Sequence, residues 1–273
     1  GKMIHDPDTE SLIRKYLNAG VMVKGKYEET TKGTPQGGNL SPLLSNIMLN
    51  ELDKELESRG LNFVRYADDC VITVRSSAAA NRVMNTITRW IEKRLGLKVN
   101  VTKTKVTTPG KLKYLGFGFW KDKEEWKARP HQDSVKRFQK ALKQLTKRSQ
   151  SVNMTVRIQR LNWVIRGWIN YFRIGSMKTV LTKIDGWLRT RMRIIIWKQW
   201  KVRAKRMWGL RKLGVPEWMA KKTVAFGDHY QAVAKTTGLR RITKEILAKR
   251  GLISCVDYYL NGTAVCRTAR TVV

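Results

Sequence analysis

The sequence predicts an α+β region built on antiparallel strands, followed by a region that is entirely helical. Up to about residue 120, short apolar runs bounded by turn residues alternate with amphipathic stretches, which favours helices packed on an antiparallel sheet. After about residue 130 the apolar residues recur every three or four positions, which is typical of helices. The charge changes at the same place: residues 1–120 carry 19 basic and 12 acidic residues, whereas residues 121–273 carry 36 and 9.

The elements of the first region are predicted from their capping and turn residues. Ser41 is the expected N-cap of a helix whose first residue is Pro42. In chain order we expect a helix over 8–20, a hairpin over 21–32, a loop over 33–38, a helix from 41 to about 60, a hairpin over 63–74, a helix over 78–95, and strands over 97–106 and 114–120.

The second region is predicted to hold three long helices and two shorter ones. The clearest has Ile158, Leu161, Ile165, Trp168 and Phe172 on one stripe. The expected segments are helices over 134–149, 156–172 and 179 to about 206, a basic linker near 203–214, and helices over 216–225 and 239–250.

The net charge points to a polyanionic partner. There are 55 Lys and Arg against 21 Asp and Glu, a formal charge of +34, and aromatic residues are interleaved with them. Such a charge repels itself unless a polyanion neutralises it, so nucleic acid is the expected ligand. A solvated surface is the alternative, but such surfaces usually mix both signs. No apolar run is long enough for a membrane span, and Cys70, Cys255 and Cys266 match no zinc spacing.

The most chemically specific feature is the pair Asp68-Asp69 between two short apolar runs. A tight hairpin tip can hold carboxylate oxygens in the fixed geometry that Mg²⁺ requires. Two metal ions held in this way can activate a 3′-hydroxyl and stabilise a leaving pyrophosphate. The alternative is that the two aspartates only favour a turn.

Five sequence blocks follow one another along the chain: Thr34 to Leu43, Tyr66 to Asp69, Gly96 to Thr104, Lys113 to Phe117 and Arg166 to Phe172. In this order they resemble the reverse transcriptases encoded by group II introns. Tyr66-Ala67-Asp68-Asp69 resembles their Y-x-D-D box, and Thr34 to Leu43 resembles the preceding P-Q-G-G-x-x-S-P-L block. Gly96 to Thr104 and Lys113 to Phe117 are similar to the L-x-x-N-x-x-K-[ST] and Y-L-G-F segments. Arg166 to Phe172 resembles the R-G-W-x-N-Y-[FY] stretch of the maturase domain X. The resemblance is to bacterial, endonuclease-lacking, group IIC-like members.

This resemblance implies the palm of a right-hand polymerase followed by a helical thumb. It places a partial reverse transcriptase palm at 1–128 and the thumb, or maturase domain X, at 129–273. The implied function is RNA-directed DNA synthesis by two-metal nucleotidyl transfer, combined with intron-RNA binding for splicing and retrohoming. The alternatives are an RNA-binding splicing maturase without polymerase activity and a retron-type or domesticated relative, which the extended domain X disfavours.

The resemblance also assigns site residues. Asp68 and Asp69 would bind two Mg²⁺ ions, with Mn²⁺ as an alternative, and Lys103 would act near the pyrophosphate; a solvated strand lysine is the alternative for Lys103. The remaining assignments are Pro35, Gln36, Gly37, Gly38, Tyr66 and Ala67 for template and nucleotide, Tyr114, Leu115 and Gly116 for the primer grip, and Arg157, Arg160, Arg166, Arg173, Arg189 and Arg193 for RNA. The loop at 36–38 could instead be a turn that leads into a helix, and the aromatics near Tyr114 could be core residues.

The expected partners are group II intron RNA, an RNA template–DNA primer duplex, target DNA and dNTPs, in a cytoplasmic bacterial ribonucleoprotein. The family has a third metal carboxylate on an upstream strand, and no F-x-D segment that would carry it is found. We therefore expect a fragment that lacks the fingers and the first catalytic Asp motif.

Residues 1–273 alone are predicted to bind RNA but not to extend a primer, because one metal ligand and the fingers are missing. Gel-shift and primer-extension assays on the same preparation check this. Robust Mg²⁺-dependent extension by this chain would contradict the prediction.

Overall fold

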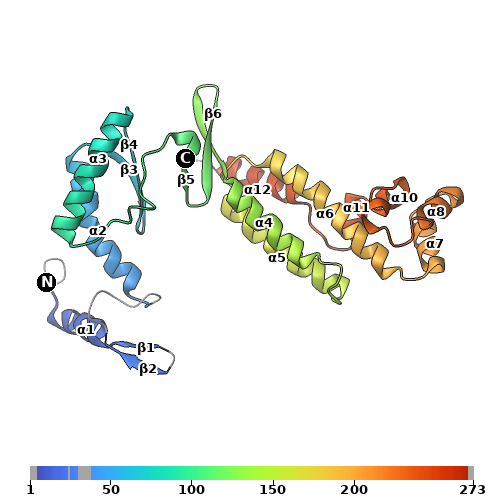
Figure 1. Ribbon diagram of the computed structural model, residues 1–273, viewed down its shortest axis with the longest axis horizontal. Coiled ribbons are helices and arrows are strands. Elements are labelled where there is room, and N and C mark those ends of the chain that lie inside the picture. Colours follow the sequence, from blue (N-terminus) through green and yellow to red (C-terminus); the bar gives the residue numbers. More distant parts are fainter. Residues whose placement is uncertain (1–4, 24, 30–37, 270–273) are drawn as a thin grey trace. The chain divides into compact units, whose positions relative to one another are not determined.

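The computed structural model describes residues 5–23, 25–29 and 38–269. The chain divides into two compact units, residues 1–107 and 108–273, and each is described by itself (Figure 1). Helices and small antiparallel sheets make up both units, so the predicted α+β class is confirmed. No helix in the described ranges has the length and apolar character needed to cross a membrane.

The described residues of the first unit form two hairpins and three α-helices, the last of which ends in a short π-helical turn. In chain order they are α1 (Pro7–Asn18), β1 (Val21–Val23), β2 (Lys26–Glu28), α2 (Ser41–Ser58), β3 (Asn62–Tyr66), β4 (Asp69–Thr73), α3 (Ser77–Trp90) and η1 (Ile91–Leu95).

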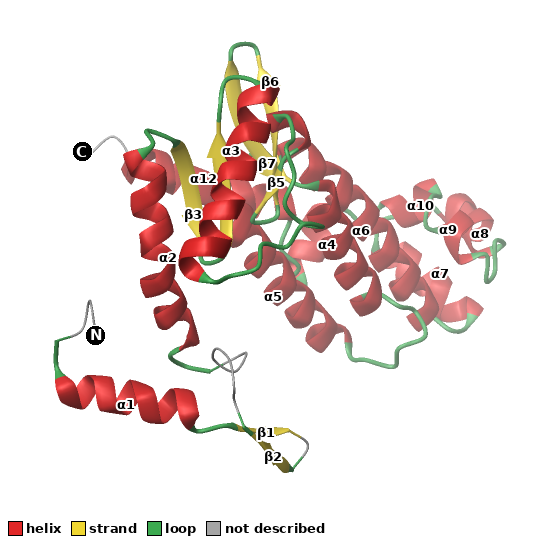
Figure 2. Ribbon diagram, turned by 60° about the vertical axis from the view of Figure 1, so that its left-hand side comes forward, coloured by secondary structure: helices red, strands yellow, loops and turns green. Residues whose placement is uncertain are grey.

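The core of this unit lies between the β3–β4 hairpin and the helices α2 and α3 (Figure 2). Its buried centre is formed by Leu52 and Leu56 of α2 with Ile87 of α3. Phe63 and Ile72 face each other across the two strands and pack against this centre. One face of the hairpin is therefore anchored, which leaves the other face for function.

Two local predictions for this unit were wrong. No strand is present over 97–106; that segment contains a turn in which Asn100 Oδ1 accepts hydrogen bonds from the backbone of Thr102 and Lys103, at 3.1 and 3.2 Å. The side-chain acceptor at Asn100 thus competes with strand pairing. Ser41 is the first residue of α2 and not its N-cap, which is Leu40.

The second unit combines a three-stranded sheet with helices of very different lengths. Its elements are η2 (Pro109–Lys111), β5 (Lys113–Tyr114), β6 (Phe117–Asp122), β7 (Glu125–Pro130), α4 (Gln132–Leu145), α5 (Met154–Phe172), α6 (Lys178–Gln199), α7 (Arg203–Lys212), α8 (Glu217–Val224), α9 (Tyr230–Val233), α10 (Thr237–Arg240), α11 (Lys244–Lys249) and α12 (Cys255–Ala269).

The single strand predicted over 114–120 is in fact a hairpin. Strands β5, β6 and β7 pair antiparallel in that order. Between β5 and β6, Leu115 and Gly116 both have positive φ, 48° and 79°, and Tyr114 pairs with Phe117. Two positive φ values in a two-residue loop are the pattern of a type I′ turn, whose twist matches that of paired strands.

The long helices of the second unit pack through apolar stripes at helical spacing. On α5 the buried apolar residues are Ile158, Leu161, Ile165, Ile169 and Phe172, which confirms the predicted stripe except that Trp168 is half-buried. The helix predicted to reach about 206 ends at Gln199. The segment near 203–214, predicted as a linker, is mostly helix α7.

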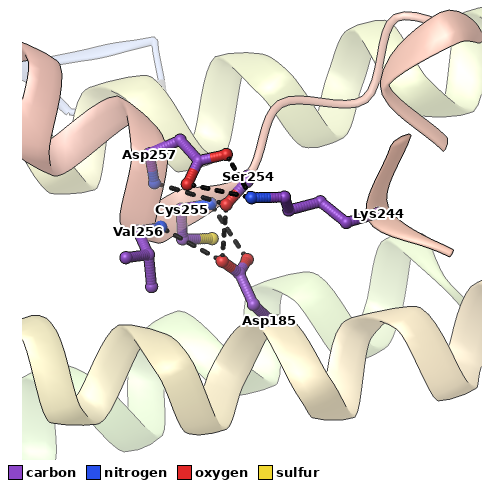
Figure 3. A network of polar contacts seen from close by, with 6 residues as sticks. All are labelled: Asp185, Lys244, Ser254, Cys255, Val256 and Asp257. Atoms are coloured by element: carbon purple, nitrogen blue, oxygen red, sulfur yellow. Dashed lines mark hydrogen bonds and ion pairs between the residues drawn. The ribbon is translucent and has the colours of Figure 1, made fainter. Parts of the chain in front are cut away.

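A buried carboxylate joins α6 to the start of α12 (Figure 3). Asp185 on α6 accepts hydrogen bonds from the backbone N–H groups of Cys255 and Val256, at 2.9 and 3.1 Å, and from the Ser254 hydroxyl at 2.9 Å. The first N–H groups of a helix have no partner within the helix, and a carboxylate is favoured beside them. Asp185 therefore fixes α12 against α6.

The Asp185→Ala variant is predicted to lose roughly 2–4 kcal/mol of unfolding free energy, because buried donors of α12 lose their acceptor. Chemical denaturation of the purified chain measures this. The matched control is Asp257→Ala, which removes an exposed ion pair with Lys244, 2.9 Å long, and should cost at most about 1 kcal/mol. Equal effects of the two substitutions would contradict the role given to Asp185.

Candidate active site and nucleic-acid interface

Asp68 and Asp69 lie at the tip of the β3–β4 hairpin. Tyr66 pairs with Asp69, so the loop consists of only Ala67 and Asp68. Ala67 has a φ of 53°, a left-handed conformation that costs a residue with a side chain roughly 1–2 kcal/mol. Such strain persists only where the surrounding structure holds it, and it is found often at functional sites.

The alternation of side chains along the strands exposes the acidic tip. Val64 and Tyr66 lie on one face of β3 and are 61% and 64% exposed. Across the hairpin, their partners on that face are Val71 and Asp69. Asp68 and Asp69 are both exposed, so two neighbouring carboxylates, Tyr66 and Ala67 meet at one open end of the hairpin.

The opposite face holds a charged residue that the sequence analysis did not single out. Arg65 points toward α2, where its Nε and Nη2 donate to the two carboxylate oxygens of Asp53 at 2.7 and 2.5 Å. Its cross-strand partner is Cys70, and burial raises the pKa of that thiol to about 11. The thiol is therefore protonated near neutral pH.

Asp68 and Asp69 are the residues at the tip that could bind a metal ion. Exposed carboxylates on a short, anchored turn suit a hard cation such as Mg²⁺, which keeps several waters and also binds substrate phosphates. Among residues whose placement is described, no group of three or more His, Cys, Asp or Glu could enclose a metal ion. The two aspartates fit such an ion as two of its ligands and not as a complete cage.

The predicted nucleotide-binding loop is only partly described. Pro35, Gln36 and Gly37 lie outside the described residues. Gly38 lies just before α2, and its carbonyl accepts a hydrogen bond from Ser41 N at 3.1 Å. The end of this loop is thus tied to the first turn of the helix that also carries Asp53.

Lys103 lies apart from the hairpin tip in the sequence but within the same compact unit. Its side chain is exposed. The Asn100 turn fixes its backbone, because Lys103 N donates to both the carbonyl and the side-chain oxygen of Asn100, at 3.1 and 3.2 Å. The turn therefore presents an exposed cation on a fixed backbone.

The predicted primer-grip residues Tyr114, Leu115 and Gly116 form the turn between β5 and β6 and belong to the second unit. Helices hold this turn in place: Gly116 O accepts from Ser134 Oγ and Leu115 O accepts from the Tyr171 hydroxyl, both at 2.9 Å. A Cβ on Gly116 would lie 3.1 Å from Ser134 Oγ. The positive φ therefore favours glycine here, and an added Cβ would require Ser134 Oγ to shift by a few tenths of an ångström.

Two of the six arginines predicted to bind RNA have structural partners instead. Arg157 is only 3% exposed. It donates to the carbonyl of Leu145, the last residue of α4, and to that of Gln150 beyond the helix, the latter at 2.9 Å. Arg193 donates to Ile242 O at 3.0 Å. Their hydrogen bonds join segments of the fold, so both side chains have a structural role.

The other four predicted arginines differ in exposure. Arg160 and Arg166 are exposed on α5, and Trp163, which is 62% exposed, lies between them. Arg173 is half-buried and donates to Asn170 Oδ1 at 2.8 Å. Arg189 is also half-buried. The pKa of Arg193 is lowered mainly by the burial of Arg193 and secondly by the charge of Arg189. The exposed part of this set is therefore a basic and aromatic surface on α5.

Comparisons with known proteins place two family domains on this chain. Residues 3–119 match the reverse transcriptase (RNA-dependent DNA polymerase) family, and residues 135–214 match the group II intron maturase-specific domain. The second match begins within α4 and ends just after α7. The two matches thus contain the acidic hairpin and the basic surface of α5, respectively.

Individual relatives agree with these matches. Over 62 residues the chain is 48% identical to the group II intron-encoded protein LtrA of Lactococcus lactis subsp. cremoris, covering 23% of this chain and 10% of LtrA. It is 31% identical to protein YkfC of Escherichia coli K12, covering 38% of this chain and 36% of YkfC. An uncharacterized 91 kDa protein in the cob intron of Schizosaccharomyces pombe is 28% identical, over 41% of this chain and 21% of that protein. The chain spans about a third or less of the length of these curated relatives.

Proposed function

Because the chain belongs to the group II intron reverse transcriptases and maturases, we propose that it carries the catalytic hairpin and the thumb of an RNA-directed DNA polymerase. The same protein would bind its intron RNA for splicing and retrohoming. One observation supports the polymerase part of this proposal. Asp68 and Asp69 are adjacent and exposed at the two-residue turn of the β3–β4 hairpin, and the opposite face of that hairpin is packed into a core.

In this proposal Asp68 and Asp69 bind Mg²⁺ together with oxygens supplied from outside the pair. When bound, the metal ions supply positive charge that stabilises the attacking 3′-oxygen and the leaving pyrophosphate. The task of the hairpin is to hold the two carboxylates still while substrates exchange. Its short loop and its anchored inner face suit that task.

Other residues of the first unit would bind the nucleotide and the template. Tyr66 lies on the same exposed face as Asp69, where an aromatic ring can contact a sugar or base. The loop Pro35 to Gly38, which leads into α2, would approach the nucleotide through its glycine backbone. Lys103 is proposed to neutralise charge on the pyrophosphate or to donate a proton to it.

The second unit would hold nucleic acid. The Tyr114–Gly116 turn is proposed to contact the primer strand, and its attachment to α4 and α5 would transmit movements of the helices to that contact. The exposed residues Arg160, Trp163 and Arg166 of α5 combine charge for phosphates with a ring for stacking. Arg173 and Arg189 are proposed to extend this surface. The proposed partners are intron RNA, the template–primer duplex, target DNA and dNTPs.

Substitution of Asp68 by Ala is predicted to abolish DNA synthesis while leaving intron-RNA binding and splicing intact, because only the metal site loses a ligand. Primer extension on a poly(A) template by the complete protein, with RNA binding measured in parallel, tests this. The control is Asp122→Ala, which removes a carboxylate flanking another two-residue hairpin loop, Lys123–Glu124 between β6 and β7.

If Asp68→Ala synthesises DNA as well as the parent, the metal-site assignment is wrong. If the parent binds intron RNA and supports splicing but makes no DNA, the alternative of a splicing maturase without polymerase activity is favoured.

Neutralising Arg160 and Arg166 together is predicted to weaken RNA binding about equally for all RNA sequences. The slope of log K against log salt should fall by about one for each phosphate that is no longer neutralised. The matched control is Arg211→Ala, because Arg211 is already paired with Glu217 at 2.7 Å. Filter binding over a range of salt concentrations gives both slopes. A slope that is flat in the parent would argue against the phosphate-binding role of α5.

A further inference from the structure

The inner face of the acidic hairpin carries a hydrogen-bond network centred on Arg65. The residue is in β3, yet its side chain is only 12% exposed. Besides its two bonds to Asp53, its Nη1 donates to Asn46 Oδ1 at 3.0 Å and to the backbone carbonyl of Ala67 at 2.8 Å. One guanidinium therefore joins helix α2 to the loop that contains Asp68.

The bond to the Ala67 carbonyl has a direct geometric consequence. That carbonyl belongs to the peptide unit that links Ala67 to Asp68, and a peptide unit is planar. Holding its oxygen therefore restricts the plane that also contains the backbone nitrogen and Cα of Asp68, the atom from which the Asp68 side chain starts. The same bond stabilises the left-handed conformation of Ala67.

The helix side of the network is equally well defined. Asn46 and Asp53 are seven residues apart, which places them two turns apart on the same face of α2. Asp53 meets the guanidinium with both oxygens, an arrangement that restricts orientation as well as distance. A lysine carries the same charge but cannot reproduce this planar fork.

An apolar side chain would be the simpler choice for an inward-facing strand position. Phe63 and Ile72 occupy neighbouring inward positions on the hairpin and pack against the core. Removing a charged pair from water is costly, and such pairs often add little net stability. A function that needs a fixed orientation at the tip accounts for the arginine better than stability does.

We propose that Arg65 is a positioning residue for polymerisation: it holds the Ala67–Asp68 peptide in a fixed orientation relative to α2. Helix α2 begins immediately after the loop proposed to contact the nucleotide, so Arg65 keeps the metal-binding carboxylates and the start of α2 in one rigid group. This inference rests on the proposed function, because it assumes that Asp68 is a metal ligand. The Arg65 guanidinium acts through Asp53, Asn46 and Ala67, to which it donates hydrogen bonds.

The test uses the complete protein with Arg65→Met, which removes all donors, Arg65→Lys, which keeps the charge without the fork, and Asp53→Asn. The matched control is Arg59→Met. Arg59 forms an ion pair with Glu55 of α2, with 2.7 Å between Nε and Oε1, and this ion pair does not involve the hairpin. Thermal unfolding establishes that each variant is folded.

Two readouts separate positioning from general stability. In primer extension, Arg65→Met should lower kcat and the apparent affinity for Mg²⁺, each by roughly 10- to 100-fold, while KM for the template–primer stays at the parent value. In hydrogen exchange of the metal-free protein, amides of residues 66–71 should exchange faster than in the parent. Arg65→Lys should give values between those of Arg65→Met and the parent in both measurements, and Arg59→Met should give the parental values in both.

Each outcome decides the inference. A folded Arg65→Met protein with parental kcat, Mg²⁺ dependence and hydrogen exchange overturns it. If Arg65→Met does not fold, Asp53→Asn decides: weaker Mg²⁺ affinity supports the inference and parental behaviour overturns it. Failure of the proposed function gives a different result: the parent makes no DNA, or Asp68→Ala makes as much DNA as the parent. In that case hydrogen exchange still shows whether Arg65 holds the turn.

Discussion

The acidic hairpin must present two neighbouring like charges to solvent on a strained turn, and the packing around it in the first unit serves this requirement. Like charges on adjacent residues repel each other, so the form of the turn depends on contacts elsewhere in the hairpin. The hairpin resists this repulsion because its inner face is held by apolar contacts with α2 and α3 and by the bonds of Arg65. Successive side chains of a β-strand point to opposite faces of the sheet, so anchoring residues and exposed residues alternate along the same strand.

A similar principle governs the β5–β6 turn in the second unit. Here the loop has two residues with positive φ, and its carbonyls are held by side chains from two different helices. Both proposed contact points with substrate are thus two-residue turns whose main-chain carbonyls accept hydrogen bonds from side chains. The donor is Arg65 of the flanking strand β3 in the first turn, and the donors come from α4 and α5 in the second. A short turn restricts the backbone, and a side-chain donor selects one orientation of its peptide units.

The sequence predicted the acidic hairpin well because apolar runs on both sides of Asp68-Asp69 leave little choice of turn position. It failed where side-chain hydrogen bonds override propensity. The β-branched residues around Asn100 favour a strand, but the Asn100 side chain binds the backbone and forms a turn. Leu115 at φ 48° was equally hard to foresee, because a leucine rarely adopts a left-handed conformation.

Arginines illustrate which site residues a sequence can and cannot distinguish. Arg157 precedes Leu161 by four positions, so it falls on the buried stripe of α5, and this spacing was available as a signal. Arg160 is one position away from that stripe and is exposed. For Arg65 the signal was its alternation with Phe63 on the inward face, which predicts a partner for the charge but does not name Asp53, twelve residues earlier. Such a partner depends on how α2 packs across the hairpin, and that packing is set by tertiary contacts that no local pattern records.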